Sequence, residues 1–279
     1  MTIHLVFITH NRLDYTKLAL ASVLAEPTEE FSLTIWDNAS TDGTVEYLKN
    51  EVNDPRIVEV VLNKENVGQT GAMNYVWSKT KAELIGKLDN DCLVTPGWTR
   101  TFAQAHRDIP RLGAVAMWHF FLEDFDFDRA KQKIQPFGNH KIFRHPWVCG
   151  SGFMIKRETF MKQGLWKEGE YVGTTYYFLK MAKAGYVNGW YYPFIYQEHM
   201  DDPLSSHCMI RDEESYHKFE KITFGLKKGM YSDVAGRFKC RQAILRNILY
   251  GPYDPSYYCG WRRKWLAAKR CIHKLIKKS

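Results

Sequence analysis

The sequence predicts an α/β fold in which a mostly parallel central sheet is flanked by helices. In the first hundred residues, short runs rich in β-branched residues alternate with longer segments that have helical spacing. The expected strands are apolar almost throughout, which is typical of parallel strands buried on both faces. Polar side chains follow three of these strands, at the edge where such sheets bind ligands.

Strands and helices are expected in strict alternation through this first part. The strands are 3–9, 31–38, 56–63 and 84–91. The helices are 12–25, 40–52 and 67–82. The first helix ends before Pro27, because proline cannot continue a helix. The second helix opens with Ser40 and Thr41, which are candidates for its N-cap.

The middle of the chain is less regular. An aromatic and charged stretch, 120–139, is expected to pass over the edge of the sheet. Segment 147–160 has the character of a strand followed by a helix, and 174–186 is a helix with Gly185 as its C-cap. Segment 189–202 is an aromatic strand that ends in acidic residues. From residue 211 onward the pattern is helical and more basic.

These patterns divide the chain into three parts. We expect an α/β domain over 1–210, a helical extension over 211–260 and a basic amphipathic tail helix over 261–279. Apolar residues make up 45% of the 279 positions, which is enough for a substantial core.

The net charge of +8 is carried by the tail. Residues 261–279 contain eight basic side chains and no acidic one, so the rest of the chain is neutral. A neutral body does not predict a nucleic-acid surface. Trp261 and Trp265 begin an apolar stripe along the tail, which favours binding to an anionic membrane surface. The alternative is a helix that docks on its own domain and exposes its basic side.

The cysteines and the hydropathy pattern bear on location. None of the six cysteines has C-x-x-C spacing, so neither a cysteine zinc site nor a disulfide framework is indicated. Polar Thr9, His10 and Asn11 interrupt the first apolar run, which is unlike a secretory signal. No apolar segment is long enough to cross a bilayer. We expect a cytoplasmic protein, peripheral at the inner face of the membrane.

Three polar clusters should meet at the carboxyl edge of the sheet. They are 9–12, Asp37-Asn38 and Asp89-Asn90-Asp91. Two carboxylates as close as Asp89 and Asp91 repel each other unless a cation lies between them. Oxygen ligands suit Mg²⁺ and Mn²⁺, so a divalent metal is the expected cation.

Six segments, in this order, resemble glycosyltransferases of family 2, which have the GT-A fold. They are "FITHNRLDYTKLALASVL", "TIWDNASTDGTVEYL", "NKENVGQTGAMNYVW", "GKLDNDCLVTPGW", "VCGSGFMIKRETF" and "KAGYVNGWYYPFIYQEH". The "DNASTDGT" variant is similar to the rhamnosyl- and galactosyl-type branch that builds bacterial surface glycans. The resemblance implies that 1–210 is a catalytic domain. It would use Mn²⁺ or Mg²⁺ to transfer a sugar from a UDP-, dTDP- or GDP-linked donor to a hydroxyl of a glycan or lipid-linked acceptor.

The resemblance also implies roles for particular residues. The residues that would bind the nucleotide are Thr9, Asp37, Asn38, Asn66, Gly68 and Asn74. Asp89 and Asp91 would hold the donor ribose and the metal, and His199 would meet the metal or the diphosphate. The turn that would line the donor sugar and the acceptor consists of Gly150, Ser151 and Gly152.

The sequence departs from the family at the catalytic base. Inverting relatives carry an E-D-x-D-like stretch before the helix that ends in A-G-Y, but the corresponding residues here, 173–176, are "GTTY". Glu170 is the first choice for the base, with Glu168 beside it. Asp201 or Asp202 are alternatives, as are a retaining mechanism without an enzyme base and a protein without transferase activity.

Two other functions compete with this interpretation. A nucleotidyltransferase would share the sheet and the metal carboxylates, but it usually has a glycine-rich loop after the first strand, and "THNRLDYT" has no glycine. A degenerate GT-A domain that only binds or scaffolds would explain the missing base.

Overall fold

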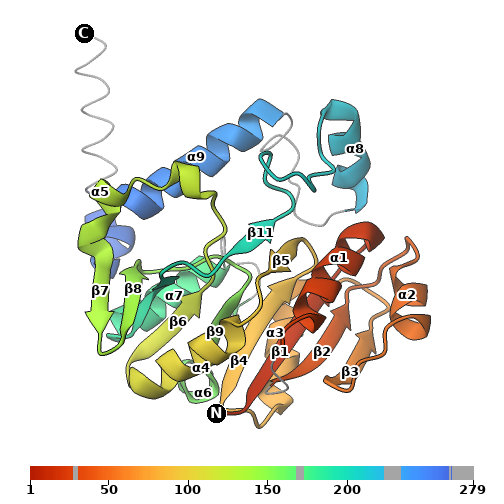
Figure 1. Cartoon of the computed structure of the whole chain (residues 1–279), viewed down its shortest axis with the longest axis horizontal. Helices are drawn as coiled ribbons and strands as arrows, with labels where there is room; N and C mark the ends of the chain where they lie inside the picture. The colour runs from red at the N-terminus through yellow and green to blue at the C-terminus, as the bar shows by residue number, and fades with distance from the viewer. Residues whose placement is uncertain (28–30, 168–172, 223–233, 264, 266–279) are drawn as a thin grey trace.

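The computed structural model describes residues 1–27, 31–167, 173–222, 234–263 and 265 of the chain. In this part of the chain the strands form two sheets. The larger has nine strands in the order β3-β2-β1-β4-β9-β6-β10-β8-β7, and the smaller pairs β11 with β5. Figure 1 shows helices on both sides of the large sheet, so the predicted α/β class is confirmed.

The bounds of these elements are as follows. The strands of the large sheet are β1 (Ile3–Thr9), β2 (Phe31–Asp37), β3 (Ile57–Leu62), β4 (Leu84–Asp89), β6 (Leu112–Ala116), β7 (Ile134–Phe137), β8 (His140–Arg144), β9 (Phe153–Lys156) and β10 (Val187–Tyr192). Those of the small sheet are β5 (Cys92–Val94) and β11 (Gln197–His199). The helices are α1 (Leu13–Leu24), α2 (Thr44–Asn50), α3 (Gly68–Lys79), α4 (Trp98–Asp108), α5 (Phe127–Ala130), α6 (Arg157–Gln163), α7 (Gly173–Lys183), α8 (Glu213–Ile222) and α9 (Val234–Tyr250).

Most strands of the large sheet point the same way. β1 is parallel to β2 and β4, β2 is parallel to β3, and β6 is parallel to β10. Only β8 and β9 run opposite to the other described strands of this sheet, since each is antiparallel to both of its neighbours. The carboxyl ends of β1, β2 and β4 therefore lie side by side at one edge.

The apolar runs of the sequence follow from burial on both faces of the sheet. Alternate residues of β1 enter two different cores: Leu5 and Phe7 pack against α1, α2 and α4, whereas Val6 and Ile8 pack against α3, α6 and α7. A strand that contributes to both cores needs apolar side chains at every position. The edge strand β3 differs, because Val58 and Val60 are exposed and only one neighbouring strand covers it.

Some predicted boundaries were wrong. The second helix begins at Thr44 rather than Ser40, because Ala39 is in the left-handed region (φ 63°) and Asp42 Oδ1 accepts from the Thr44 amide at 3.2 Å. The aromatic segment 189–202 is two strands, β10 and β11, separated at Pro193, which lacks an amide hydrogen for a strand pair. The pattern analysis did not identify α4 and β6. The predicted C-cap at Gly185 is confirmed, with φ 83°.

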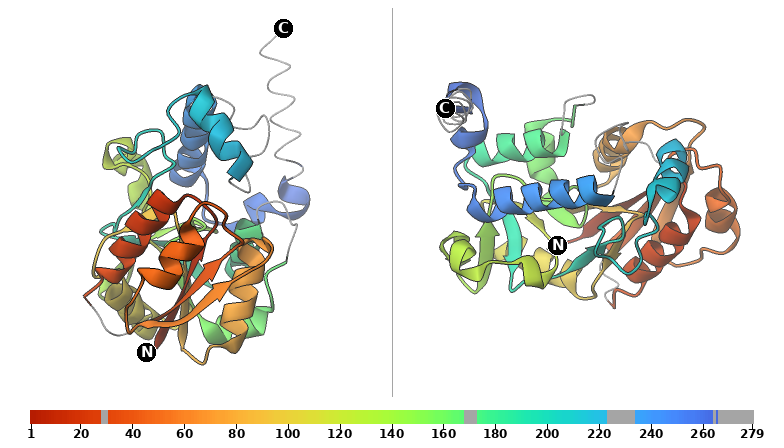
Figure 2. Two further views of the ribbon diagram at one scale, coloured as in Figure 1. Left: turned by 90° about the vertical axis from the view of Figure 1, so that its right-hand side faces the viewer. Right: turned by 90° about the horizontal axis from the view of Figure 1, so that it is seen from above.

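The C-terminal helices lie across the carboxyl edge of the sheet. Figures 1 and 2 show α8 and α9 on the side of the molecule where β11 and the loop after it emerge. α9 is anchored in the second core through Leu245, Ile248 and Leu249. Of the predicted tail helix, 264 and 266–279 lie outside the described residues. No helix in the described part of the chain is long and apolar enough to span a membrane.

Candidate active site

The ends of β1, β2 and β4 are joined by backbone hydrogen bonds. The Asn38 amide donates to Thr9 O at 2.8 Å, and the Asn90 amide donates to Ile8 O at 3.1 Å. The Asn90 side chain adds bonds from Nδ2 to Asn11 O at 2.9 Å and to Thr9 Oγ1 at 3.2 Å. The cluster at 9–12 is therefore bonded to both of the other clusters, to 37–38 through the Asn38 amide and to 89–91 through Asn90.

The turn after β1 has an unusual backbone. Asn11 and Arg12 both lie in the left-handed region, with φ values of 54° and 59°. Residues other than glycine rarely adopt this left-handed backbone conformation, and backbone strain of this kind is concentrated at functional sites. Bonds from the neighbouring turn stabilise it, since Thr41 N donates to Asn11 Oδ1 and Asn11 N donates to Ser40 Oγ, each at 2.7 Å. The turn directs the Arg12 side chain toward the end of β4.

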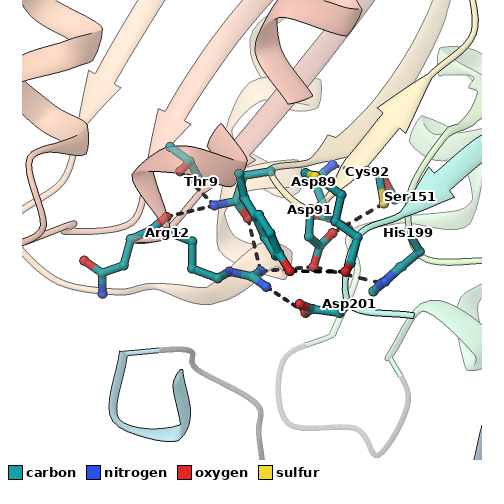
Figure 3. A network of polar contacts seen from close by, with 12 residues as sticks. Thr9, Arg12, Asp89, Asp91, Cys92, Ser151, His199 and Asp201 are labelled. Atoms are coloured by element: carbon teal, nitrogen blue, oxygen red, sulfur yellow. Dashed lines mark hydrogen bonds and ion pairs between the residues drawn. The ribbon is translucent and has the colours of Figure 1, made fainter. Parts of the chain in front are cut away.

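Arg12 connects two carboxylates. Its Nη2 lies 3.0 Å from Asp91 Oδ2 and its Nη1 lies 2.7 Å from Asp201 Oδ2 (Figure 3). The Arg12 side chain is only 7% exposed, so water screens these pairs weakly. From the sequence, Asp201 was predicted only as an alternative base, and Arg12 had no predicted role of its own.

Asp89 has a different buried cation. The Lys87 side chain is fully buried, and its ammonium group donates to Asp89 Oδ2 at 2.7 Å, Gln69 Oε1 at 2.6 Å and Gly150 O at 2.7 Å. These three acceptors match the three hydrogens of an ammonium group. A lysine inside an apolar strand is the sequence signal that was overlooked, since a buried charge requires a partner.

Asp91 and His199 face each other because β5 and β11 pair. His199 lies opposite Cys92 in that pair, and its Nε2 is 3.9 Å from Asp91 Oδ2. Ligand atoms of Asp91, Cys92 and His199 lie within 4.8 Å of one another. Burial above all, and then the neighbouring carboxylates Asp91 and Asp89, raise the pKa of the Cys92 thiol. The Asp91 carboxylate suits Mn²⁺ or Mg²⁺, and the nitrogen of the His199 imidazole suits Mn²⁺ better than the harder Mg²⁺.

The two carboxylates of the turn differ in acidity. Burial raises the pKa of Asp91, but attraction to His199 and Arg12 outweighs burial and holds that pKa below its ordinary value. Burial raises the pKa of Asp89 above its ordinary value, and attraction to Lys87 offsets only part of the rise. The attraction to these two groups thus keeps Asp91 in the ionised form that a metal ligand requires.

Asp37 lies at the opposite end of this edge. It is fully buried, and its Oδ2 accepts from the Ser40 amide at 3.0 Å. Its Oδ1 is buried and has no hydrogen-bond partner within the described ranges. An enclosed carboxylate oxygen without a donor is costly, and a ligand N–H or O–H group would remove that cost. The neighbouring Asn38 Oδ1 accepts from Trp36 Nε1 at 3.0 Å.

Three other predicted site residues, Thr9, Asn66 and Asn74, form hydrogen bonds within the protein. Thr9 is buried, and its hydroxyl is bonded to Thr16 Oγ1 at 2.8 Å. Asn66 Oδ1 accepts from Gly68 N at 2.9 Å, where α3 begins. Asn74 exchanges two hydrogen bonds with the backbone of Trp166, at 2.8 and 2.9 Å, so its amide supports that loop.

The predicted turn beside the sugar lies next to Asp89. Ser151 Oγ accepts from the Asp89 amide at 3.0 Å, and Gly150 O accepts from Lys87. Gly152 has φ 63° and leaves no room for a side chain, since an added Cβ would lie 2.2 Å from Gln197 Oε1.

Two of the four candidates for the catalytic base lie within the described residues and two lie outside them. Glu168 and Glu170 lie outside the described residues. Asp201 is paired with Arg12, and Asp202 is paired with Arg241 of α9, which also pairs with Asp124. Each of the two described candidates, Asp201 and Asp202, is thus paired with the guanidinium group of a different arginine.

A cavity of about 280 Å³ opens beside His199. Its walls come from the segment after β6, from β11 and the loop after it, and from helix α9. Phe120, Ile210 and Ile244 supply apolar surface, and His119 and Arg241 supply polar groups. The volume is near the lower end of small-molecule sites, about 300 Å³, so it suits a group the size of one sugar.

The sequence matches one family model. The model for glycosyl transferase family 2 matches residues 5–179, which include most of β1, the strands β2 to β9 and the polar turns that follow β1, β2 and β4. No curated protein matches the sequence.

Three solved structures with similar folds share 15% to 17% sequence identity with this chain. A mannosyltransferase, PcManGT from Pyrobaculum calidifontis in complex with GDP-Man and Mn²⁺, matches with a TM-score of 0.59 and 17% identity, over 97% of this chain and 79% of its own. GalNAc-T7 with UDP, GalNAc and Mn²⁺ matches with a TM-score of 0.55 and 16% identity, over 71% of this chain and 44% of its own. TarS from S. aureus matches with a TM-score of 0.53 and 15% identity, over 80% of this chain and 39% of its own. These likenesses confirm the GT-A fold.

Proposed function

The chain belongs to glycosyl transferase family 2, and from this premise we propose that it transfers a sugar from a nucleoside-diphosphate sugar to a hydroxyl group of a glycan or lipid-linked acceptor. Membership makes the protein a glycosyltransferase and removes the nucleotidyltransferase alternative. The donor, the metal and the acceptor are the proposal. The observation that carries it is the pair Asp91 and His199, with 3.9 Å between Oδ2 and Nε2, on the edge that also holds Asp37.

The donor would lie along the carboxyl edge of the strands. Asp37 Oδ1, which has no partner among the described residues, would accept a hydrogen bond from the nucleoside. Asp91 and His199 would hold Mn²⁺ or Mg²⁺, which offsets the charge of the diphosphate and makes it a better leaving group. The distant structures with GDP-Man and Mn²⁺ and with UDP and Mn²⁺ support this choice of ligand.

The sugar to be transferred, or the hydroxyl that accepts it, would occupy the cavity beside His199. The cavity adjoins the proposed metal residues and is too small for a whole nucleotide sugar. Its mixed wall, with Phe120 and Ile244 beside His119 and Arg241, suits a sugar ring that has apolar C–H faces and polar hydroxyl groups.

Glu170 remains the first choice for the base that takes the proton of the acceptor hydroxyl. Arg12 and Arg241 already engage Asp201 and Asp202, and a carboxylate that must bind a proton during the reaction is better left without a fixed cation.

We also propose that 261–279 brings the enzyme to an anionic membrane surface on the cytoplasmic side. Trp261 and Trp265, one helical turn apart, are both exposed. Co-sedimentation with anionic liposomes, before and after deletion of 261–279, tests this. Loss of binding on deletion supports the proposal, and unchanged binding contradicts it.

Donor hydrolysis tests the main proposal. The purified chain is incubated with UDP-, GDP- and dTDP-sugars, with Mn²⁺ or with EDTA, and release of the nucleoside diphosphate is measured. We expect metal-dependent release from at least one donor. If no donor is hydrolysed and calorimetry detects no nucleotide binding, the protein is a scaffold with a GT-A fold and the proposal is wrong.

A further inference from the structure

Each carboxylate of the Asp89-Asn90-Asp91 turn already has a buried cation that the chain itself supplies. Lys87 lies beside Asp89 at 2.7 Å, and Arg12 lies beside Asp91 at 3.0 Å. Asp201, the third carboxylate of this cluster, shares Arg12. With His199 neutral, as a metal ligand must be, these three carboxylates and two cations leave a single net negative charge where the divalent metal would bind.

The position of Arg12 matters more than its charge alone. Arg12 Nη2 contacts the Oδ2 atom of Asp91, and this same oxygen lies nearest to His199 Nε2. A metal between Asp91 and His199 would therefore share an oxygen ligand with a guanidinium group. Two cations so close repel each other, and the buried setting of Arg12, with 7% of its side chain exposed, leaves little water to screen them.

We infer that Arg12 is a positioning residue that keeps the affinity of Asp91 and His199 for a divalent cation low until a nucleoside diphosphate is bound. The inference rests on the proposed function. The diphosphate brings negative charge that offsets Arg12, so nucleotide and metal bind cooperatively. By thermodynamic linkage, the factor by which the nucleotide tightens metal binding equals the factor by which the metal tightens nucleotide binding.

A merely structural role for Arg12 makes the opposite prediction. If Arg12 only orients Asp91, its removal should misplace the carboxylate and weaken metal binding. The backbone part of Arg12 is separable from its charge, because Arg12 O accepts from the Thr16 amide at 2.9 Å whatever side chain is present. Gln keeps hydrogen-bond donors without the charge, and Lys keeps the charge without the planar fork.

The test is the affinity for Mn²⁺, measured from the electron paramagnetic resonance signal of the free ion, with and without UDP or GDP. Without nucleotide, R12Q should bind Mn²⁺ about tenfold or more tightly than the unaltered chain, and R12K should stay within about threefold. D201N should bind Mn²⁺ at least about threefold more weakly, because Arg12 is then left to Asp91 alone. In R12Q the nucleotide should add less affinity than in the unaltered chain.

The outcomes separate this inference from the proposed function. Equal or weaker Mn²⁺ binding by a folded R12Q overturns the inference, and so does tighter binding by D201N. Circular dichroism melting curves establish folding, and if R12Q does not fold, R12K and D201N still decide. If the unaltered chain binds UDP or GDP with Mn²⁺ but R12Q is no tighter, only the inference fails. If the unaltered chain binds neither metal nor nucleotide, both fail.

Discussion

Arg12 and Asp201 are 189 positions apart, yet Arg12 Nη1 and Asp201 Oδ2 are 2.7 Å apart. The pair joins the turn after β1 to the loop after β11, and the other guanidinium nitrogen of Arg12 reaches Asp91. Helix α9 holds the same loop from the other side, since Arg237 donates to Asp201 O and Arg241 pairs with Asp202. The proposed metal residues are therefore fixed by elements from both ends of the chain.

Asp37→Asn should weaken nucleotide binding without affecting the metal. The change removes a buried charged acceptor, and hydrogen bonds to charged groups contribute about 1.5–3 kcal/mol, or roughly a tenfold to a hundredfold loss of affinity. Calorimetry with UDP and GDP measures the loss, and Mn²⁺ binding without nucleotide should stay within about twofold. Glu46→Gln, at an exposed position of α2, is the control. Unchanged nucleotide affinity in the Asp37 variant would remove Asp37 from the site.

Lys87→Met should destabilise the fold. It leaves Asp89 without its cation in a buried setting, and breaking a buried pair in this way costs about 3–5 kcal/mol. Urea denaturation measures the free energy of unfolding. Lys81→Met, at an exposed position, should change it by less than about 0.5 kcal/mol. If the two variants are equally stable, Lys87 does not neutralise Asp89.

The free energy of unfolding should fall in mild acid, because His106 binds a proton only in the unfolded chain. Burial lowers the pKa of His106 to about 3, whereas an unfolded histidine has a pKa near 6.5. As the pH drops from 6.5 toward 3, the unfolded chain binds a proton that the folded chain does not, so unfolding becomes more favourable.

The size of this effect can be measured by urea denaturation at pH 7.5 and 5.0. His106 should account for about 2 kcal/mol of the loss in the free energy of unfolding between these values. His106→Gln keeps a donor for Met154 O, which His106 Nε2 contacts at 3.2 Å, and should lose that much less on acidification. Equal losses in the two proteins would show that His106 titrates normally.

Ile244→Trp should separate sugar transfer from nucleotide binding. The larger side chain would fill the cavity between α9 and His199, where we propose that the transferred or accepting sugar lies. We expect transfer to an acceptor to fall at least about tenfold while affinity for UDP or GDP with Mn²⁺ stays the same. Ile244→Val is the matched control. If the Trp variant transfers sugar normally, the cavity is not part of the site.

The sequence was most informative where local pattern determines structure. β1, β2 and β4 were predicted within two residues of their ends, and the convergence of their polar ends is confirmed by the bonds from Asn38 and Asn90. The apolar runs were informative because both faces of these strands are buried. α2 was predicted to begin too early because its N-cap is Gly43, in the left-handed region at φ 94°, rather than Ser40.

The ion pairs of Arg12 and Arg241 could not be predicted from the local sequence pattern. Nothing local pairs position 12 with 201 or 202 with 241, since such contacts exist only after the sheet and α9 have assembled. The ion pair between Lys87 and Asp89 could have been predicted, because a lysine in a buried strand needs an anionic partner and Asp89 is two residues away. The roles assigned to Asp37, Asp91 and His199 stay predictions, and Glu170 lies outside the described residues.

Nucleotide binding by Asp91→Asn tests the central claim most directly. Calorimetry would compare UDP and GDP binding by this variant and by the unaltered chain, with Mn²⁺ and with EDTA. Our account predicts that Mn²⁺ tightens nucleotide binding to the unaltered chain about tenfold or more, and that the Asn variant loses this gain although circular dichroism shows that it is folded. If Mn²⁺ tightens nucleotide binding equally in both proteins, Asp91 does not hold the metal and the proposed site is wrong.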